Sequence, residues 1–396
     1  MRSLLFVCNL IPKKLGTFER YLAEFGWRCR AESVRFGLVL AGEPIREVAN
    51  LFRDAGIEWW AIPNWNDDSD QERSKCFLAS FVPILRRGPW RVAVFQFCHE
   101  LTIIRALVGA RLRGCAPGKS IWIQHSQMVL PGRLARRFSK IRLLAAFVDG
   151  MILLSEAGRT AVCARGWSSE RATVIRNGIP ILDQLKRGWL RSAMGLPSDA
   201  VVLICVGTLI PRKGYDILLP ALAPLLQSHP LRHFLIVGDG PDKSDLHSLV
   251  ESLGISRSVH FLGLRNDVPE LLADADLFVL ASRAEGLTLA VVEAMAAELP
   301  VVVTDVGGHR EVVSPETGWI VPPGNAIAMR TAISEALEHP NVRELGRASR
   351  RLVQRDFSLP GQIEAQYQYF LQVAQSPTGV KSPFDKPRAI GTGDGI

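Results

Sequence analysis

Two glutamates eight residues apart, Glu285 and Glu293, mark the part of this chain whose residue types point most directly to chemistry. Gly286 follows the first glutamate, and a run of apolar residues that favour a helix carries the second. The preceding residues, 275–282, read as a short apolar strand that ends in a loop. The segment therefore predicts a strand, a loop with one carboxylate, and a helix with a second carboxylate about two turns beyond its start.

This layout predicts a site for a phosphate flanked by hydroxyl groups. The N-terminus of a helix carries free N–H groups and the positive end of the helix dipole, and both attract phosphate. An ionised carboxylate accepts hydrogen bonds, so it suits the vicinal hydroxyls of a sugar. A phosphate pocket between two groups that bind diols is what a sugar nucleotide requires.

Segments on either side of this pair extend the pattern. The segment from Glu285 to Glu293 resembles the signature of the retaining glycosyltransferases of the GT-B fold, of the family-4 or group-1 type. Further stretches, strongest between about residues 200 and 340, resemble that family in the expected order: 206–214, 234–241, 259–263, 266–268, 300–308 and 318–321. The resemblance implies two Rossmann-like domains that face each other across a deep cleft. It also implies a front-face reaction, in which the leaving phosphate helps to deprotonate the acceptor and the configuration is retained.

The resemblance assigns roles in binding the donor. It implies that Glu285 contacts the hydroxyls of the transferred sugar and that Glu293 contacts the ribose diol. The departing diphosphate needs positive charge in the transition state. The candidates to supply it are Arg212, Lys213 and the backbone of Gly286, Leu287 and Thr288.

Two other places complete the predicted donor site. In the family an arginine often follows the glycine after the first strand of this domain, and Thr208 stands at that position here. Arg212 is our candidate to replace the missing guanidinium. Arg265 and Val268 lie in the stretch that resembles the base-binding loop, where recognition acts largely through the backbone.

The N-terminal half resembles the family more loosely. Gly16 is similar to the glycine that lets the backbone approach the diphosphate, although the family usually has two adjacent glycines. His125 follows a strand-like run and fits the place of a family histidine near the sugar and the acceptor; a packed histidine is the alternative. For His99, which also ends a strand-like run, a packing role is the favoured interpretation. Glu311 stays open between the start of a helix and a donor contact.

Nothing in the chain points to a metal or a cofactor. No Asp-x-Asp motif occurs in a suitable place, and no carboxylate stands out as a nucleophile. The turn at residues 238–240 lacks the third glycine of a dinucleotide-binding loop. The seven cysteines have no metal-ligand spacing, so we expect reduced thiols. Positive side chains and helix dipoles are expected to stabilise the leaving diphosphate in place of a metal ion.

The net charge of +8 is unevenly distributed. Residues 1–180 hold 27 Lys and Arg against 15 Asp and Glu, and residues 81–142 hold 12 basic residues with Glu100 as the single acid. This basic region is either a solvated face or a surface that docks on anionic lipid head groups. Because no recognition motif accompanies the charge, we do not expect a nucleic acid partner.

Apolar strand-like runs alternate with helical patterns along the whole chain, which predicts an α/β fold with largely parallel sheets. The expected strands are 4–7, 36–40, 92–97, 121–124 and 151–154, then 201–206, 233–237, 259–262, 277–280 and 301–304. With 396 residues, two domains are expected, 1–180 and 181–360, with a hinge at Asn177–Pro180. Residues 361–375 are expected to form a helix that crosses back to the first domain, and 376–396 a disordered tail.

These observations predict a retaining, metal-independent glycosyltransferase that moves a hexose-type sugar from a UDP- or GDP-sugar to a hydroxyl of a lipid-linked or surface-polysaccharide acceptor. The alternatives are a sugar-nucleotide epimerase of the same architecture and a non-catalytic protein that binds nucleotide sugars. No run of 18 apolar residues is present, and the first ten residues read as a strand rather than a signal peptide. We therefore expect a cytoplasmic protein, free or peripheral on the inner face of the cytoplasmic membrane.

Overall fold

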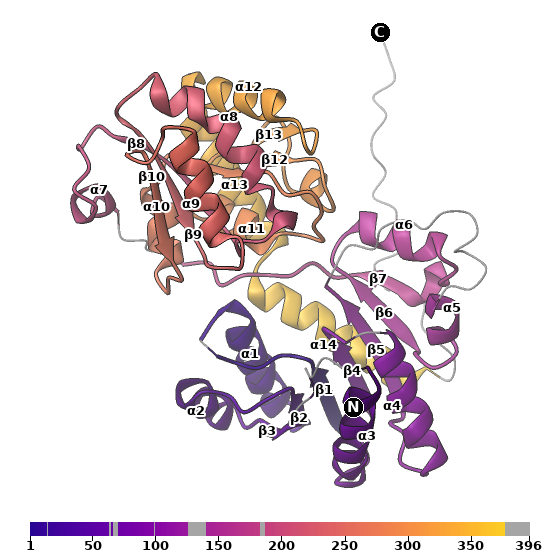
Figure 1. The fold of residues 1–396 in the computed structure, drawn as a ribbon. Coiled ribbons are helices and arrows are strands. Elements are labelled where there is room, and N and C mark those ends of the chain that lie inside the picture. The colour runs from indigo at the N-terminus through magenta and orange to yellow at the C-terminus, as the bar shows by residue number, and fades with distance from the viewer. Residues whose placement is uncertain are drawn as a thin grey trace. The chain divides into compact units, whose positions relative to one another are not determined.

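A computed structural model describes residues 1–13, 15–62, 65, 70–98, 100–125, 140–182 and 187–376 (Figure 1). The chain divides into two compact units. Unit 1 comprises residues 1–153, 159–175 and the chain from Ile363 onward, and unit 2 comprises residues 154–158 and 176–362. Each unit is built on its own parallel sheet, so the predicted α/β class with two Rossmann-like halves is confirmed.

Unit 1 contains a seven-stranded sheet in the order β3-β2-β1-β4-β5-β6-β7, in which all neighbours are parallel. Its strands are nearly continuous apolar runs, as expected for a parallel sheet covered on both faces. They are β1 (Ser3–Cys8), β2 (Arg35–Leu40), β3 (Glu58–Ala61), β4 (Val92–Gln96), β5 (Lys119–Gln124), β6 (Gly150–Leu153) and β7 (Ala172–Val174). The order reverses at β1, whose neighbours are β2 and β4.

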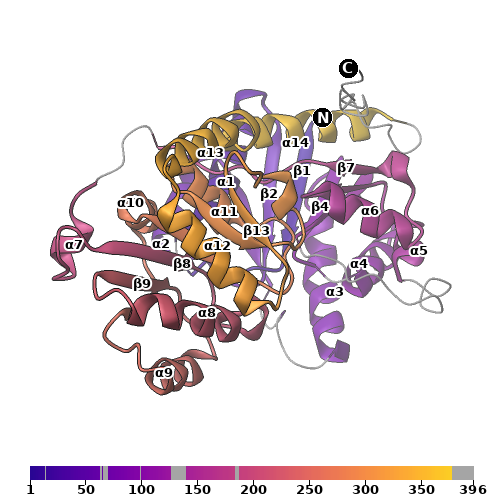
Figure 2. The same ribbon diagram turned by 90° about the horizontal axis from the view of Figure 1, so that it is seen from above.

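Helices cover both faces of this sheet (Figure 2). One face carries a large core to which α3 (Asp70–Arg86), α4 (Glu100–Leu112), α5 (Lys140–Leu144) and α6 (Glu156–Ala164) contribute. On the other side lie α1 (Thr17–Ala31), α2 (Arg46–Asp54) and α14 (Leu359–Gln375). The Phe370 ring of α14 packs against Phe6 of β1 and Phe25 of α1, with centroids 5.9 and 5.8 Å apart. The Tyr21 hydroxyl donates to Gln366 at 2.6 Å, so α14 from Ile363 onward is part of this unit.

Unit 2 contains a six-stranded parallel sheet in the order β10-β9-β8-β11-β12-β13. Its strands are β8 (Val201–Val206), β9 (Arg232–Val237), β10 (Val259–Gly263), β11 (Leu277–Leu280), β12 (Val301–Thr304) and β13 (Gly318–Val321). Its helices are α7 (Leu190–Ala193), α8 (Tyr215–Gln227), α9 (Lys243–Ser252), α10 (Val268–Asp274), α11 (Leu289–Ala296), α12 (Ala326–Glu338) and α13 (Val342–Asp356). Helix α8 packs against α9 and α12, and α11 packs against α10 and α13.

All ten strands expected from the sequence are present, and three further strands were not predicted. These three, β3, β7 and β13, are all edge strands of their sheets. An edge strand has a neighbour on one side only, so its sequence need not be a continuous apolar run. Phe97, which was expected to end a strand, lies just beyond β4 with a φ of +55°.

Some predictions fall on residues that the structure does not describe. They concern His99, the basic residues between 126 and 139, and the tail from 377 to 396. In the described part of the chain, no helix is long and apolar enough to cross a bilayer.

Candidate active site

The candidate site lies at the carboxyl ends of β8 and β11. The strand order in unit 2 reverses at β8, because β9 and β10 lie on one side of it and β11 on the other. At such a reversal the loops leave the sheet in opposite directions, and a crevice forms between them. Arg212 and Lys213 follow β8 on a 3-10 turn (Pro211–Lys213), and Ser282 and Glu285 follow β11. Two loops about 70 residues apart in the sequence therefore meet at one place.

Glu285 is the centre of this cluster. Its Oε1 lies 2.8 Å from the Lys213 Nζ and accepts a hydrogen bond of 2.8 Å from the Ser282 hydroxyl. Its Oε2 lies 2.8 Å from the Arg212 Nη1, which also donates to the backbone oxygen of Ala284 at 3.0 Å. Both carboxylate oxygens thus have charge-assisted partners.

Burial distinguishes the two cations. The side chains of Glu285 and Lys213 are only 7% and 9% exposed, whereas that of Arg212 is 48% exposed. Burial by itself raises the pKa of Glu285, but Lys213, Ser282 and Arg212 together outweigh it and hold the pKa below its ordinary value. The carboxylate is therefore ionised at neutral pH. Two cations around one anion leave a net charge of +1, and the exposed guanidinium of Arg212 has donors left for a ligand.

The N-terminus of α11 begins directly after this loop. Thr288 is its N-cap residue, but its side chain makes no capping hydrogen bond to the helix. The first N–H groups of a helix have no partners inside the helix. Leu287 and Thr288 are buried, and Gly286 is half-buried. The N-terminus of α11 therefore lies beside the cluster of Glu285, Lys213 and Arg212, which has a net positive charge.

The position of Glu293 corrects one sequence prediction. The helix begins at Leu289, so half-buried Glu293 lies about one turn into it, not two. Residues 285–288 form the connecting loop because the Glu285 side chain and the Gly286 carbonyl are held by neighbouring loops.

A buried hydrogen-bond chain explains why Thr288 does not cap the helix. Its hydroxyl lies 2.9 Å from the Nε2 of His309, and the Nδ1 of that ring lies 2.7 Å from the backbone oxygen of Thr304. A carbonyl can only accept, so Nδ1 carries the proton and Nε2 accepts from Thr288. Burial lowers the pKa of His309, which agrees with a neutral ring. The Thr304 hydroxyl donates to the backbone oxygen of Ser282 at 2.6 Å, so the chain connects the loops after β11 and β12.

Two glycines bring the loop after β12 against the Glu285 loop. The Gly308 N–H donates to the Gly286 carbonyl at 2.6 Å. Gly307 has a φ of +57°, and a Cβ atom there would stand 2.2 Å from the carbonyl oxygen of Glu285. Only glycine fits this position, because both the conformation and the close approach exclude a side chain.

The other predicted donor residues of unit 2 lie around this cluster. Thr208 is exposed in the loop after β8. The guanidinium of Arg265 makes a two-pronged ion pair with Asp267, with distances of 2.8 and 2.6 Å. Half-buried Val268 is the first residue of α10. The structure gives no direct contact of these three residues with Glu285, so their donor roles stay predictions.

Glu311 has structural partners. Its Oε1 accepts from the backbone N–H groups of Glu156 and Ala157, at 2.7 and 3.3 Å, at the start of α6. Its Oε2 pairs with Arg176 at 2.8 Å. The Ser155 hydroxyl accepts from Gly158 N–H at 3.1 Å, in the first turn of the same helix. Of the two interpretations of Glu311, the structure favours stabilisation of a helix start.

Unit 1 carries the two remaining predicted residues. Gly16 is the N-cap of α1, and its N–H donates to the Glu19 side chain at 3.0 Å. His125 follows β5, and its Nε2 lies 3.2 Å from the Oε1 of Gln96, at the end of β4. Burial lowers the pKa of His125. Gly16 and His125 therefore lie beyond the carboxyl ends of β1 and β5, where the predicted order of strands and helices placed them.

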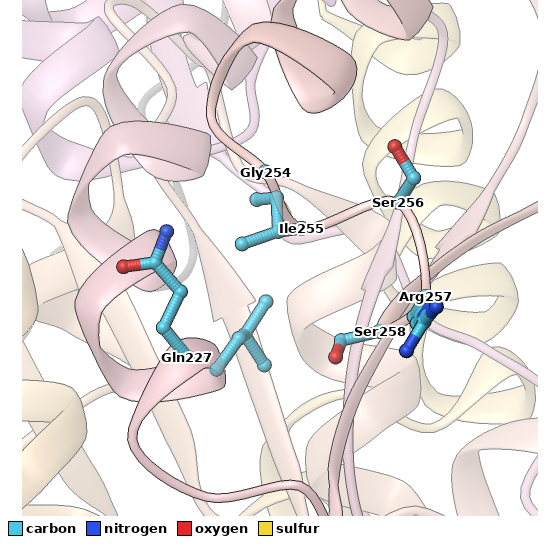
Figure 3. A pocket seen from close by; sticks show the side chains of 7 residues that line it. Gln227, Gly254, Ile255, Ser256, Arg257 and Ser258 are labelled. Carbon is cyan, nitrogen blue, oxygen red and sulfur yellow. The ribbon is translucent and has the colours of Figure 1, made fainter.

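Two cavities lie elsewhere. One, of about 390 Å³, is lined by the end of α8 and the loop before β10, including Gln227, Gly254 and Arg257 (Figure 3). The other, of about 580 Å³, is lined by residues 85–91, before β4, and by residues of the 114–118 loop, before β5. Both lie at amino ends of strands, so neither belongs to the candidate site. No three His, Cys, Asp or Glu side chains gather into a metal-binding group in the described residues; independence of a metal stays a prediction.

Some residues that contact the predicted ones were not themselves predicted to function: Ser282, His309, Gln96 and Phe97. Thr304, which contacts Ser282 and His309, was not predicted either. His309 had a signal in the sequence, because it directly follows Gly307 and Gly308 in a loop after a strand. The others are ordinary residues at strand ends, and nothing in the local sequence separates them from core or loop residues.

Comparison with known proteins shows which proteins this chain resembles. Residues 189–351 match the family model described as Glycosyl transferases group 1. The chain is 32% identical over 223 residues to the "Putative glycosyltransferase EpsD" of Bacillus subtilis, covering 52% of this chain and 57% of that protein. It is 33% identical over 178 residues to a GDP-mannose-dependent phosphatidylinositol monomannoside mannosyltransferase of Corynebacterium glutamicum, covering 42% and 46%. The chain thus spans about half the length of these curated relatives.

Solved structures extend the likeness to the whole fold. The Anabaena protein HepE, solved in complex with UDP-glucose, is 22% identical, with a TM-score of 0.75 over 93% of this chain and 99% of that one. A glycosyltransferase from Rickettsia africae is 15% identical, with a TM-score of 0.76 over 95% and 99%. At these identities the likeness concerns the fold alone. In sequence, residues 189–351 are therefore similar to the group-1 glycosyltransferases, and the chain as a whole has the GT-B fold of these solved structures.

Proposed function

We propose that this protein is a retaining, metal-independent glycosyltransferase that moves a hexose-type sugar from a UDP- or GDP-sugar to a hydroxyl of a lipid-linked or saccharide acceptor. The observation that carries the proposal is the buried Glu285 with Lys213 and Arg212, beside the N-terminus of α11. The names of two relatives support the donor class, since one is GDP-mannose-dependent and the other was solved with UDP-glucose.

The charges of the cluster suit a leaving diphosphate. Breaking the bond between the sugar and the phosphate develops negative charge on the phosphate oxygen. Lys213 is fixed by Glu285 and is almost buried, so its charge needs little reorganisation during the reaction. Arg212 and the first N–H groups of α11 add further positive potential.

The carboxylates then have separate tasks in binding. Glu285 is ionised, so it accepts hydrogen bonds from hydroxyls of the transferred sugar. Glu293, one turn into α11, is proposed to accept the ribose diol. His125, which burial keeps neutral, is proposed to contact the sugar or the acceptor.

A thermal-shift screen of the full chain tests the donor site. The ligands are UDP-, GDP- and ADP-sugars and the free nucleotides. A ligand at 100 times its Kd stabilises the folded state by about 2.7 kcal/mol. For a unit of this size that free energy corresponds to a rise in Tm of about 5–10 °C. We expect one nucleotide to stabilise the wild type but not Glu293→Ala. Stabilisation by none of them would contradict the proposal.

Turnover separates transfer from the alternatives. A transferase releases nucleotide in proportion to glycosylated acceptor, whereas an epimerase converts the donor without an acceptor. A binding protein shows the thermal shift but no turnover with any acceptor. Retention is measured from the anomeric configuration of the product by NMR.

We also propose that the basic region of unit 1 docks on an anionic membrane that presents the acceptor. Arg86, Arg87 and Arg91 line the cavity of about 580 Å³. The end of α4 adds Arg111 and Arg113 on either side of Leu112, whose surface is 81% exposed. Basic residues around an exposed apolar side chain combine the two attractions of an anionic lipid surface.

Co-sedimentation with vesicles tests this docking. Each basic residue near such a surface contributes about 1 kcal/mol, so reversing two charges weakens binding by at least about 30-fold. We expect Arg111→Glu with Arg113→Glu to lose binding to phosphatidylglycerol vesicles, and neither protein to bind phosphatidylcholine vesicles. The matched control is Arg347→Glu with Arg351→Glu, two exposed arginines of α13 in unit 2. Equal loss in the control would show that net charge, not this surface, is responsible.

A further inference from the structure

The surroundings of His125 constrain its ring in three directions. The ring stacks on Phe97 with centroids 4.0 Å apart and planes inclined by 21°. The Phe18 ring of α1 meets both rings at their edges, at 6.4 Å from His125 and 5.0 Å from Phe97. The Gln96 Oε1 lies 3.2 Å from Nε2 of the same ring. A histidine that merely fills space needs neither a parallel stack nor a polar partner.

The backbone at Phe97 is in an unusual conformation. Its φ of +55° is one of three positive φ values among the described residues other than glycine, and the other two belong to Ser33 and Glu298. The left-handed region is unfavourable for a bulky side chain, and such strain persists where the surrounding structure requires it. Here the strained backbone turns the Phe97 ring onto the His125 ring. Phe97 remains 38% exposed, so it lies outside the closed hydrophobic core.

The side chain of Gln96 is also in an unfavourable environment. It is 1% exposed, its Oε1 faces His125, and its Nε2 has no hydrogen-bond partner in the described part of the chain. A buried amide with half of its hydrogen bonds unmade is unfavourable, and native proteins keep few of them. Gln96 lies at the carboxyl end of β4, next to the strand-order reversal of unit 1. This is the position at which a parallel sheet places its ligand contacts.

We propose that Gln96 and Phe97 are positioning residues that hold His125 as the neutral tautomer with its proton on Nε2, so that Nδ1 accepts a hydrogen bond from a substrate hydroxyl. The amide oxygen of Gln96 can only accept, which places the proton on Nε2. The stack fixes the plane of the ring and therefore the direction of the Nδ1 lone pair. The identity of the substrate rests on the proposed function, but the state of the ring does not.

Nitrogen-15 NMR of the histidine-labelled full chain tests the ring directly, with His125→Gln to assign its signals. We expect the Nε2–H tautomer, with a proton that exchanges with water at least tenfold more slowly than in Gln96→Leu. The matched control, Gln124→Leu, changes a second buried glutamine at the end of the neighbouring strand β5. We expect it to leave the tautomer and the exchange rate unchanged. A proton on Nδ1 in the wild type, or no change in Gln96→Leu, would overturn the proposal.

Kinetics then test whether the position matters. A small misplacement of a reacting group costs up to about 100-fold in rate. We expect Gln96→Leu and Phe97→Leu to lower kcat at least tenfold with the donor KM within about twofold, and Phe97→Tyr, which keeps the stack, to retain activity. A normal kcat in Gln96→Leu with a disturbed ring would also overturn the proposal.

Gln96→Glu separates positioning from general damage. Burial is the cause of the lowered pKa of His125 among the described residues, and no charged group contributes to it. A carboxylate at position 96 keeps the acceptor but stabilises the imidazolium, so the pKa of His125 rises. We expect activity at least tenfold below wild type at pH 6 and within about threefold at pH 9. An equal loss at both pH values would contradict the proposal. If the wild type transfers no sugar at all, the proposed function fails while NMR still decides the state of the ring.

Discussion

Replacing Lys213 by methionine removes the buried cation that compensates Glu285. Methionine keeps the length and apolar character of the lysine stem, so the change acts mainly on the charge. The Glu285 carboxylate, 7% exposed, then keeps Arg212 and the Ser282 hydroxyl but loses its nearest buried partner. The variant should therefore unfold more easily than the wild type.

The expected loss follows from the burial of the pair. Removing one partner of a buried ion pair costs about 3–5 kcal/mol. Because two partners of Glu285 remain, we expect the lower end, about 3 kcal/mol, or a fall in Tm of about 6–12 °C for a unit of this size. Arg212→Met should cost less than about 1 kcal/mol, since the Arg212 side chain is 48% exposed and water screens its ion pair.

The loss should depend on pH. The folded-state pKa of Glu285 lies below its ordinary value of about 4.5, so its ionic contacts stabilise the fold above that pH. The stabilisation is lost as the pH falls through the folded-state pKa. The difference in stability between wild type and Lys213→Met should therefore be largest at pH 7 and should shrink below about pH 4.5.

Urea unfolding and scanning fluorimetry from pH 7 to pH 4 measure both effects. The double variant Lys213→Met with Glu285→Gln removes both charges, so it should regain most of the lost stability. Lys243→Met, at a side chain 46% exposed, controls for the loss of a lysine and should change the Tm by less than about 1 °C. A fall in Tm below 2 °C for Lys213→Met, or a difference independent of pH, would refute this account of the cluster.

Three further changes test other contacts in unit 2. Gly307→Ala should lower the Tm and abolish donor binding in the thermal-shift assay. At a φ of +57°, its Cβ would stand 2.2 Å from the carbonyl oxygen of Glu285. Retained binding would show that the loop can rearrange without loss of the donor site. Thr288→Val leaves the buried Nε2 of His309 without its 2.9 Å donor, so urea unfolding should show a loss of about 1–3 kcal/mol. Gly346→Ala places a Cβ 1.9 Å from a carbonyl oxygen of the loop after α11. It should lower the Tm by several degrees, while the donor KM at low temperature stays near the wild-type value.

Part of the fold follows from local sequence because the central strands are buried on both sides. A buried parallel strand must be an apolar run, so nine of the ten expected strands were recognisable as central strands; the tenth, β10, is an edge strand that was still predicted. The edge strands β3, β7 and β13 satisfy this condition less strictly and were missed. Their place is determined by hydrogen bonds to a neighbouring strand, which a local pattern does not contain.

The first residue of α11 could not be predicted from the local sequence. Apolar residues with good helix propensity predict a helix around Glu293, but not its first residue. The helix begins at Leu289 because the residues before it contact other loops: Glu285 contacts Lys213, and Thr288 contacts His309. The first residue of the helix is therefore a result of tertiary contacts.

By itself, the sequence determined the alternation of strands and helices, the two-part organisation of a GT-B fold, and the glutamate pair with its strand, loop and helix. These features depend on residues within about ten positions of one another, where the backbone restricts the outcomes. Only the tertiary structure decided that Glu285 is buried with Lys213 and Arg212, that Glu311 holds the start of α6, and that Phe97 stacks on His125. The physical reason is that parallel strands bring their carboxyl ends together from distant parts of the chain, so the partner of each side chain depends on strand order.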